Sequence, residues 1–369
     1  MSGYIDSGKS LKNDDYPSLN SQRMQSSGPK QSWAKRPDNY TYFTSNASFF
    51  HQFLNRRQQD ILLFHKDSGQ PRDQVIINNT LLCGADEGSA FLLLVLVVSR
   101  PLNMEARNAI RETWGKDLKD KGAKLGFVLG FPTVDSLQRK LLQENSVHKD
   151  LIQGNFLDTY FNLSIKTLAL LRWASLFCSK VKFVLKSDDD MFINSRALLK
   201  VVKTRNDTRT ILGLLAHKWP PHRNKKSKWY VPPEIYPYEY YPDFLAGPAY
   251  LISGDATSLL YAARESTVFF YLEDVYITGI LAEKAGVRRL GLLGLNNVRQ
   301  TFKDVISQTA ITSHGHSPRS LRNWWKLVLL KTMYSPKNNE TIINTATITT
   351  LSIGLSNNKK LLTDLSKKK

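Results

Sequence analysis

The feature that most constrains the fold is an unbroken apolar run at residues 91–98. It ends at Ser99-Arg100-Pro101, as a buried strand that runs into a turn does. A strand without polar alternation is covered on both faces, so the sheet that contains it lies between two layers. The run is also too short to cross a bilayer, which needs about 20 apolar residues.

The segments on either side alternate between strand and helix patterns. The clearest helix covers residues 162–177, which carry a wide apolar stripe. Asn103 is expected to cap a helix over residues 104–114, and Gly115 to stop it. Such alternation predicts an α/β fold with a largely parallel sheet. The other expected strands are 125–129, 181–185, 210–215 and 249–253, and the other expected helices are 136–144 and 274–283.

Composition divides the chain into three parts. Residues 1–80 are mostly polar and lack a periodic apolar face, so a largely disordered tail or stem is expected. Residues 81–335 hold the predicted strands and helices. Residues 336–369 turn polar again and end in three lysines, which predicts a mobile basic tail. The sequence as given shows neither a membrane-spanning run nor a signal peptide.

The chain is strongly basic, with 51 Lys and Arg against 32 Asp and Glu, a formal charge of +19. This surplus attracts polyanions, a class that includes nucleic acid, anionic membranes, phosphorylated ligands and acidic glycans. A nucleic-acid-binding protein is therefore one alternative. Many of the basic residues lie in the tails, and no known nucleic-acid module is recognisable, so no nucleic-acid partner is expected.

Cysteine usage and glycosylation patterns bear on the compartment. Cys83 and Cys178 are too few for a disulfide scaffold or a four-ligand zinc site; they form one bridge or remain as two buried thiols. Six tripeptides match the N-glycosylation pattern, which favours the secretory pathway. They begin at Asn39, Asn46, Asn78, Asn162, Asn206 and Asn339.

The sharpest chemical signal is Asp188-Asp189-Asp190, directly after the predicted strand 181–185. Ligands of open α/β sheets bind at this carboxyl edge. Three adjacent carboxylates repel one another unless a cation or donors neutralise them, and hard oxygen ligands suit Mg²⁺ or Mn²⁺. In an extended segment Asp188 and Asp190 point to one side and share a metal, while Asp189 faces away. The alternative is a solvated acidic turn.

Two further pairs of charged residues are candidates for chemistry. Arg107 and Arg111 lie four apart on a predicted helix, where two guanidiniums can grip a diphosphate or simply form a basic solvated face. Glu273 and Asp274 lie at a predicted helix start, where carboxylates are stabilised and able to accept a proton. An ordinary helix cap is the alternative for that pair.

Residues 228–250 combine many aromatic side chains with prolines. Aromatic faces pack against the C–H groups of sugar rings, and they also stack on bases or fill the interior of a long loop. The candidates for contact with a sugar, which become acceptor contacts under the family resemblance given below, are Trp229, Tyr236, Tyr241, Phe244 and Gly247.

These residues occur within a series of motifs in a fixed order. The series is Arg107-x-x-Ile-Arg111-x-Thr-Trp, Asn155-Phe-Leu-Asp-x-Tyr-x-Asn-Leu-x-x-Lys-Thr167, Lys186-Ser-Asp-Asp-Asp190, Tyr241-Pro-x₄-Gly-x-x-Tyr250 and Glu273-Asp-Val275. It resembles the β-1,3-galactosyltransferase family of Golgi glycosyltransferases (glycosyltransferase family 31) over roughly residues 83–290.

The resemblance implies a GT-A fold over 81–335: a Rossmann-like, mostly parallel sheet with helices on both faces, continuous with an acceptor-binding half. It implies Mn²⁺, held by Asp188 and Asp190 together with His314 or His316. It also implies a donor, UDP-galactose or UDP-N-acetylglucosamine, and an inverting transfer to the 3-hydroxyl of a glycan on protein or lipid. Donor contacts are expected from Arg107, Arg111, Lys186, Asp188 and Asp189.

By the same resemblance, Asp274 is the expected catalytic base, with Glu273 beside it. Cys83 and Cys178 lie where the family tends to have cysteines, so a bridge between them is a hypothesis. The expected location is the Golgi lumen or membrane. The chain departs from the family in showing no amino-terminal transmembrane helix and no cysteine in its carboxyl-terminal third. A catalytically silent glycan-binding member is the remaining alternative, against which the intact acidic pairs argue.

Overall fold

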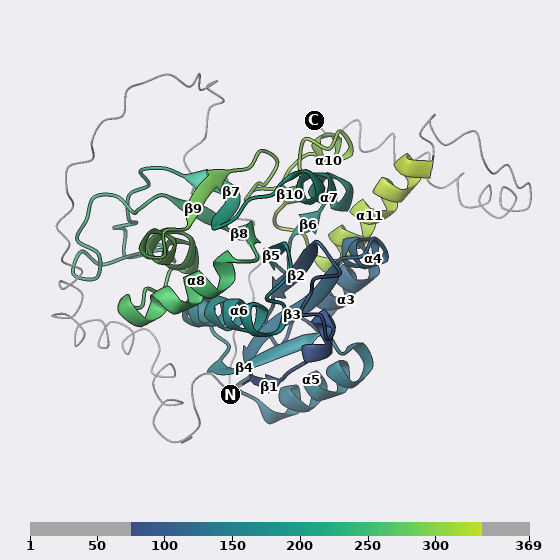
Figure 1. The fold of residues 1–369 in the computed structure, drawn as a ribbon, viewed down its shortest axis with the longest axis horizontal. Coiled ribbons are helices and arrows are strands. Elements are labelled where there is room, and N and C mark those ends of the chain that lie inside the picture. The colour runs from purple at the N-terminus through teal and green to yellow at the C-terminus, as the bar shows by residue number, and fades with distance from the viewer. Residues whose placement is uncertain (1–74, 334–369) are drawn as a thin grey trace, which may run out of the picture. The chain divides into compact units, whose positions relative to one another are not determined.

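The computed structural model describes residues 75–333, where one eight-stranded sheet is flanked by helices (Figure 1). Its strand order is β1-β4-β3-β2-β5-β8-β7-β9. The central strands β4, β3, β2 and β5 are parallel, whereas β8 runs antiparallel to β5 and β7. The strands are β1 Val75–Ile77, β2 Leu93–Val98, β3 Lys124–Phe131, β4 Leu151–Leu157, β5 Phe183–Asp188, β7 Thr210–Ala216, β8 Phe244–Ser253 and β9 Arg288–Gly291.

A separate pair of short strands, β6 (Phe192–Ile193) and β10 (Thr312–Ser313), lies beyond the end of β5. The helices discussed below have the following bounds: α3 Met104–Glu112, α4 Trp114–Asp120, α5 Asp135–His148, α6 Leu163–Phe177, α7 Ser195–Thr204, α8 Ala256–Ala263, η6 Val275–Leu281, α9 Ala282–Lys284, α10 Phe302–Ile306 and α11 Pro318–Met333.

Helices cover both faces of the sheet. Along β2 the side chains alternate between two buried clusters: Val95 packs in the one that includes α3, α4 and α7, and Leu96 in the one that includes α6 and α8. The predicted strand covered on both faces is therefore confirmed over Leu93–Val98, while Phe91 and Leu92 precede it. The mostly parallel sheet between two helical layers likewise confirms the predicted α/β fold class of GT-A type.

Two predicted helices differ in the structure. The helix expected over 104–114 ends at Glu112, and α4 begins at Trp114 and runs through Gly115. Gly115 allows close packing rather than stopping the helix, since a Cβ there would lie 2.5 Å from the Ile110 carbonyl oxygen. The helix expected over 274–283 is a π-helix, η6, followed by the short α9. π-Helices are rare and are frequently found at functional sites.

Some elements were not predicted at all, and β4 shows why. Its sequence includes Gln153, Gly154 and Asn155, which interrupt the apolar pattern. Gln153 is nevertheless buried, because its amide donates to the Gly130 carbonyl oxygen at 3.0 Å and exchanges hydrogen bonds with Gln138. Tertiary contacts thus satisfy a polar group that the sequence pattern reads as exposed.

The N-glycosylation tripeptides fall in different environments. Asn162 is buried and its amide donates to the Leu157 carbonyl oxygen at 2.8 Å, so it is closed to modification in the folded protein. Asn78 and Asn206 are exposed. The other three tripeptides and both predicted tails, apart from residues 75–80, lie outside the described residues. Across residues 75–333 no helix combines the length and the apolar character that a membrane span requires.

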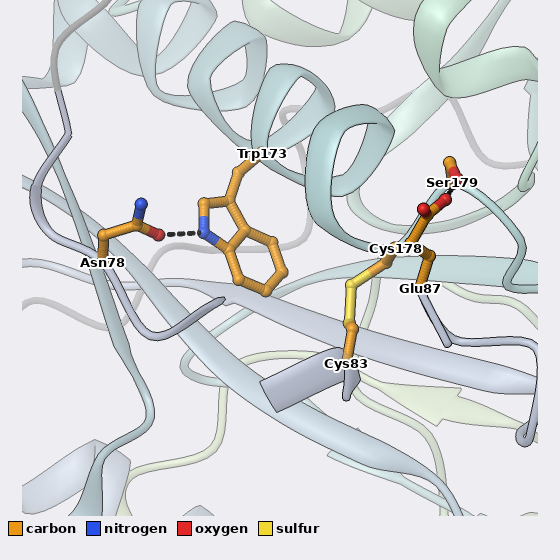
Figure 2. Close-up of a disulfide and its surroundings, with 6 residues drawn as sticks. All are labelled: Asn78, Cys83, Glu87, Trp173, Cys178 and Ser179. Carbon is orange, nitrogen blue, oxygen red and sulfur yellow. Dashed lines mark hydrogen bonds between the residues drawn. A yellow bond between two sulfur atoms is a disulfide. The ribbon is translucent and has the colours of Figure 1, made fainter. Parts of the chain in front are cut away.

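A disulfide joins Cys83 to Cys178, with 5.5 Å between their Cα atoms (Figure 2). It links the short helix Thr80–Cys83 to the residue that follows α6. Nearby, the Trp173 indole N–H donates to the Asn78 side-chain oxygen at 2.8 Å, which ties the same two segments together. The bridge expected from the family resemblance is thus present.

Removing this bridge is expected to destabilise the domain. The two cysteines are 95 residues apart, and releasing a loop of that length costs about 2–5 kcal/mol of unfolding free energy. Guanidinium unfolding of C83A/C178A should show this loss, and a reductant should lower the wild-type midpoint but not that of the variant. A wild-type midpoint unchanged by reductant would contradict the bridge.

Candidate active site

The three aspartates lie at the carboxyl edge of the sheet, as predicted. β5 ends at Asp188, which is paired in register with Val98 at the end of β2. Asp189 faces away from the other two: its Oδ2 accepts hydrogen bonds from Ser99 Oγ at 2.6 Å and Asn103 Nδ2 at 2.9 Å. Asn103 therefore anchors the acidic turn rather than capping α3.

His314 joins Asp188 and Asp190 in a cluster that has the chemistry of a metal site. One potential ligand atom from each residue lies within 4.8 Å of the others. His314 Nε2 is 3.2 Å from Asp190 Oδ2. The pairing of β10 with β6 brings His314 there from more than 120 residues away, since Ser313 lies opposite Phe192. Two carboxylates and an imidazole form a donor set that fits Mn²⁺ or Mg²⁺.

His316, the second predicted candidate, is a structural residue. It is buried, and its two ring nitrogens lie 2.9 Å from Ser313 Oγ and 3.0 Å from Ser320 Oγ. Its ring packs edge-on against Trp324. Burial lowers the pKa of His316 to about 4, so the imidazole is neutral at physiological pH. Both ring nitrogens have serine partners and His316 is not part of the Asp188–Asp190–His314 cluster, so the prediction of His316 as a metal ligand is corrected.

The two aspartates of the cluster have pKa values shifted in opposite directions. Burial raises the pKa of Asp188 to about 6, against the opposing effect of Lys186 and with the aid of Asp190. Burial acts in the same sense on Asp190, but the hydrogen bond and charge of His314 outweigh it and lower the pKa of that carboxyl. A divalent cation between the carboxylates would favour their ionised forms.

Lys186 connects this cluster to the second acidic pair. Its side chain is buried, and its Nζ donates to Asp188 Oδ1 and to the Gly247 carbonyl oxygen, both at 2.6 Å. The same nitrogen lies 3.8 Å from Glu273 Oε2. Two of the three ammonium protons thus form hydrogen bonds within the protein. Lys186 was predicted to contact the sugar donor, but in the structure it links the two acidic groups.

Glu273 and Asp274 have different surroundings. Glu273 is buried, and its Oε1 accepts a hydrogen bond from Tyr250 Oη at 2.5 Å. Asp274 is half-buried, and its Oδ1 accepts the Val275 N–H at 2.9 Å. Burial, followed by the neighbouring charge of Glu273, raises the pKa of Asp274 to about 6. This value suits Asp274 to exchange a proton near neutral pH.

Gly247 keeps the approach to these carboxylates open. A Cβ at this position would lie 3.4 Å from Asp274 Oδ2 and 3.5 Å from Glu273 Oε2. Any side chain would therefore occupy the space in front of the acidic pair. Gly247 lies on β8, which runs antiparallel to β5, so the two acidic groups meet where β5 ends and β8 begins.

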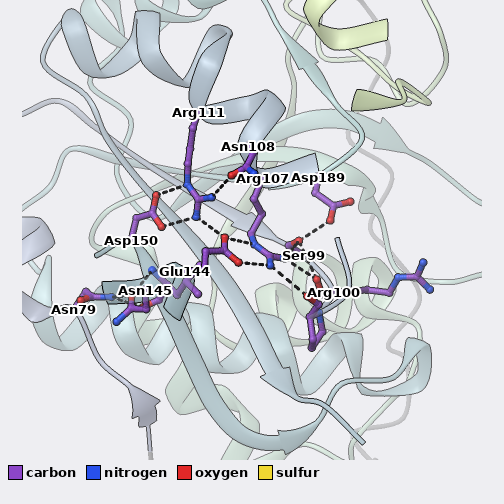
Figure 3. A network of polar contacts seen from close by, with 12 residues as sticks. Asn79, Ser99, Arg100, Arg107, Asn108, Arg111, Glu144, Asn145, Asp150 and Asp189 are labelled. Atoms are coloured by element: carbon purple, nitrogen blue, oxygen red, sulfur yellow. Dashed lines mark hydrogen bonds and ion pairs between the residues drawn. The ribbon is translucent and has the colours of Figure 1, made fainter. Parts of the chain in front are cut away.

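Arg107 and Arg111 form a buried ion-pair network instead of a ligand-binding face (Figure 3). Arg107 is fully buried, and its guanidinium contacts both Glu144 oxygens at 2.8 and 2.6 Å. Arg111 donates to Glu144 at 2.7 Å and to both oxygens of Asp150 at 2.8 Å. The prediction that the two residues grip a diphosphate is corrected, because their donors are used inside the protein.

The network supports the acidic turn from behind. Arg107 Nη1 also donates to Ser99 Oγ at 3.0 Å, and Ser99 in turn holds Asp189. Burial would raise the pKa of Glu144, but hydrogen bonds and charges from the two arginines lower it. Glu144 was not predicted as an important residue. The signal was available, since two arginines one turn apart on a helix facing the core require an acidic partner.

A second buried pair lies under the same loop. Lys166 Nζ on α6 contacts Asp158 at 2.9 Å and donates to the Ser99 carbonyl oxygen at 2.8 Å. Both residues belong to the motif series, but sequence reasoning gave neither a role. A lysine within the apolar stripe of a helix was the available signal.

Three of the predicted acceptor residues belong to the core. Tyr236, Tyr241 and Phe244 are buried; the ring centroids of Tyr236 and Tyr241 are 5.0 Å apart, and those of Tyr241 and Phe244 are 6.0 Å apart. The prediction of direct sugar contact is corrected for Tyr236 and Phe244, because both are buried and pack against Tyr241. Tyr241 differs, because its hydroxyl is buried and has no hydrogen-bond partner in the described part of the chain. Trp229 is only partly buried.

A mostly parallel α/β sheet with an Asp-Asp-His cluster beside a second acidic pair is the arrangement that the GT-A prediction called for. A family model described as galactosyltransferase matches residues 105–292. The chain belongs to this galactosyltransferase family. The matched region includes both acidic pairs and ends before His314.

Two curated relatives illustrate the likeness. β-1,3-Galactosyltransferase 2 of Homo sapiens is 36% identical over 273 residues, which are 70% of this chain and 64% of that protein. β-1,3-Galactosyltransferase 1 of Mus musculus is 34% identical over 257 residues, or 68% of this chain and 77% of that protein. The chain thus spans just under two thirds of the first relative's length.

Solved structures superpose loosely on the chain. A Drosophila β-1,4-galactosyltransferase 7 mutant, crystallised with manganese, UDP-Gal and xylobiose, shares 12% identity with a TM-score of 0.32; the match covers 70% of this chain and 79% of that one.

The two histidines provide a matched test of the metal cluster. His314→Gln should weaken Mn²⁺ binding by at least tenfold, because it removes a ligand, whereas His316→Gln should leave the affinity within about twofold. Calorimetric titration with MnCl₂ measures both. Equal affinities for the two variants, with both folded by circular dichroism, would rule out His314 as a ligand.

Proposed function

We propose that the protein transfers galactose from UDP-galactose to the 3-hydroxyl of a glycan acceptor, with inversion, to give a β-1,3 linkage. The observation that carries the proposal is the link through Lys186: its buried ammonium group contacts Asp188 of the metal-type cluster and lies 3.8 Å from Glu273, the neighbour of the proposed base Asp274. Membership of the galactosyltransferase family and the printed names of the relatives support galactose as the transferred sugar.

Asp188, Asp190 and His314 are the residues that would hold Mn²⁺. When bound, the cation neutralises negative charge on a diphosphate leaving group. Asp189 would lie on the opposite side of the turn, where Ser99 and Asn103 fix it, and so serve the geometry of the turn rather than contact the donor.

Asp274 would act as the general base. It takes the proton of the acceptor hydroxyl as that oxygen attacks the anomeric carbon, the bond from this carbon to the UDP oxygen breaks, and UDP leaves as an anion. Attack from the face opposite UDP converts an α-linked donor to a β-linked product in one displacement. Glu273, held by Tyr250 and close to Lys186, would position Asp274 and help to raise its pKa.

The compartment forms part of the proposal. The Cys83–Cys178 disulfide fits an oxidising environment, and Asn78 and Asn206 lie exposed where a glycan could be attached. Both observations support the secretory pathway and, with the family resemblance, the Golgi lumen.

The direct test is release of UDP from a panel of UDP-sugars with β-linked glycan acceptors. We expect turnover with Mn²⁺, none with excess EDTA, and a preference for UDP-galactose, with the product linkage assigned by NMR. A preference for UDP-N-acetylglucosamine would keep the mechanism and replace the donor. A folded protein that binds glycans but releases no UDP from any donor would instead be a catalytically silent member.

The pH dependence tests the role of Asp274. A base works when deprotonated, so kcat/KM should fall about tenfold per pH unit below a midpoint near pH 6, the value to which burial and Glu273 raise the pKa of Asp274. Asp274→Asn should lower kcat by about 10²–10⁴-fold. The exposed Glu265→Gln serves as the matched control. An Asp274→Asn variant that keeps wild-type kcat and the same acid limb would exclude this base.

A further inference from the structure

We propose that the tip of the loop between β7 and β8, residues 223–230, binds an anionic group, a carboxylate or sulfate, on the acceptor glycan. The inference rests on the proposed function and adds to it the chemical class of the acceptor. The loop is the long connection between β7 and β8 in Figure 1.

The loop carries a local excess of positive charge. The whole loop, residues 217–243, holds five Lys and Arg and three Asp and Glu, and all five basic residues precede the first acidic one, Glu234. Three of the lysines, Lys225, Lys226 and Lys228, are exposed within four residues of one another. Like charges held so close together repel unless an anion offsets them. Lys226 and Lys228 form no ion pair within residues 75–333.

The tip is a fixed structure that presents these lysines. Arg223 donates to three backbone carbonyl oxygens, those of Val231 at 2.8 Å, Tyr236 at 2.6 Å and Tyr238 at 3.2 Å. The backbone then turns tightly, with Ser227 N–H donating to the Asn224 carbonyl oxygen at 3.0 Å and Tyr230 N–H to that of Ser227 at 3.1 Å. The Arg223 guanidinium therefore holds the loop together through backbone carbonyl oxygens, while the three lysines stay exposed to solvent.

The tip is attached to the segment that carries the proposed base. The Tyr271 hydroxyl donates to the Tyr230 carbonyl oxygen, and Tyr271 lies three residues before Asp274. Phe270 packs on Tyr236, with 5.8 Å between their ring centroids. An acceptor whose hydroxyl reaches Asp274 would thus extend toward the lysines.

An aromatic ring within the tip favours a sugar over other polyanions. Trp229 is partly exposed; Lys228 Nζ lies 4.5 Å from its ring centroid, and the His222 ring centroid lies 5.4 Å away. A cation beside a single aromatic face suits one sugar ring that bears an acidic group. Extended nucleic acid needs a track of stacking platforms and basic residues, and this short turn holds only two adjacent aromatic residues, Trp229 and Tyr230.

The test compares matched acceptors. One β-linked disaccharide is used in neutral, 6-sulfated and uronate-terminated forms with wild type, K226Q/K228Q and the control K200Q/K203Q, whose two exposed lysines lie on α7. For wild type we expect a KM about five- to tenfold lower for an acidic form than for the neutral one, rising with NaCl. This advantage should vanish in K226Q/K228Q and persist in K200Q/K203Q.

The two acidic forms separate sulfate from carboxylate as the group recognised. Equal KM values for neutral and acidic acceptors, or an advantage that survives in K226Q/K228Q, would overturn the inference. Binding of the same three disaccharides by calorimetry makes the result independent of turnover. If no donor is consumed but the acidic form still binds wild type more tightly than K226Q/K228Q, the proposed function fails and this inference stands. Salt-sensitive binding to single-stranded DNA that matches binding to the acidic disaccharide would favour a nucleic-acid partner and also overturn it.

Discussion

Several carboxylates have to coexist at one edge of this sheet, and buried Lys186 makes this possible. Its ammonium group donates to Asp188 and to the Gly247 carbonyl oxygen, and it lies 3.8 Å from Glu273. Burial raises the pKa of Asp188 and of Asp274, and the charge of Lys186 opposes that rise at both carboxyls. One buried side chain therefore links the metal-type cluster to Glu273, the residue next to Asp274. Because β5 and β8 run antiparallel, Lys186 lies opposite Tyr250, and the same pairing brings both acidic groups to it.

A second layer of buried charge holds this edge from behind. The Arg107–Glu144 pair reaches the side chain of Ser99, the residue after β2 (Figure 3). The Lys166–Asp158 pair reaches the backbone carbonyl of the same residue. Breaking a buried pair leaves an unpaired charge, which costs several kcal/mol. These residues thus fix the loop against which the Asp188–Asp190 turn is built. Motif residues that looked like ligand contacts are instead the support of the site.

Much of the fold and part of the site could be read from the sequence. The run at 91–98, the helix at 162–177 and the strand before the aspartates follow from apolar periodicity, which depends on local spacing alone. β4 could not be read in this way, because Gln153 is satisfied by partners on other elements. The outward turn of Asp189 was predicted by the alternation of an extended chain and agrees with its contacts to Ser99 and Asn103.

By itself, the sequence determined the α/β class, the acidic edge and the motif series that places the chain in its family. These properties are encoded in local patterns and in residue order. Only the tertiary structure decided three points. His314 joins the two aspartates and His316 does not, Arg107 is buried in an ion pair with Glu144, and Glu273 rather than Asp274 accepts the Tyr250 hydroxyl. Each of these outcomes depends on which side chains from distant segments meet. The strand pairings β6–β10 and β5–β8 set those meetings, and spacing along one sequence does not record them.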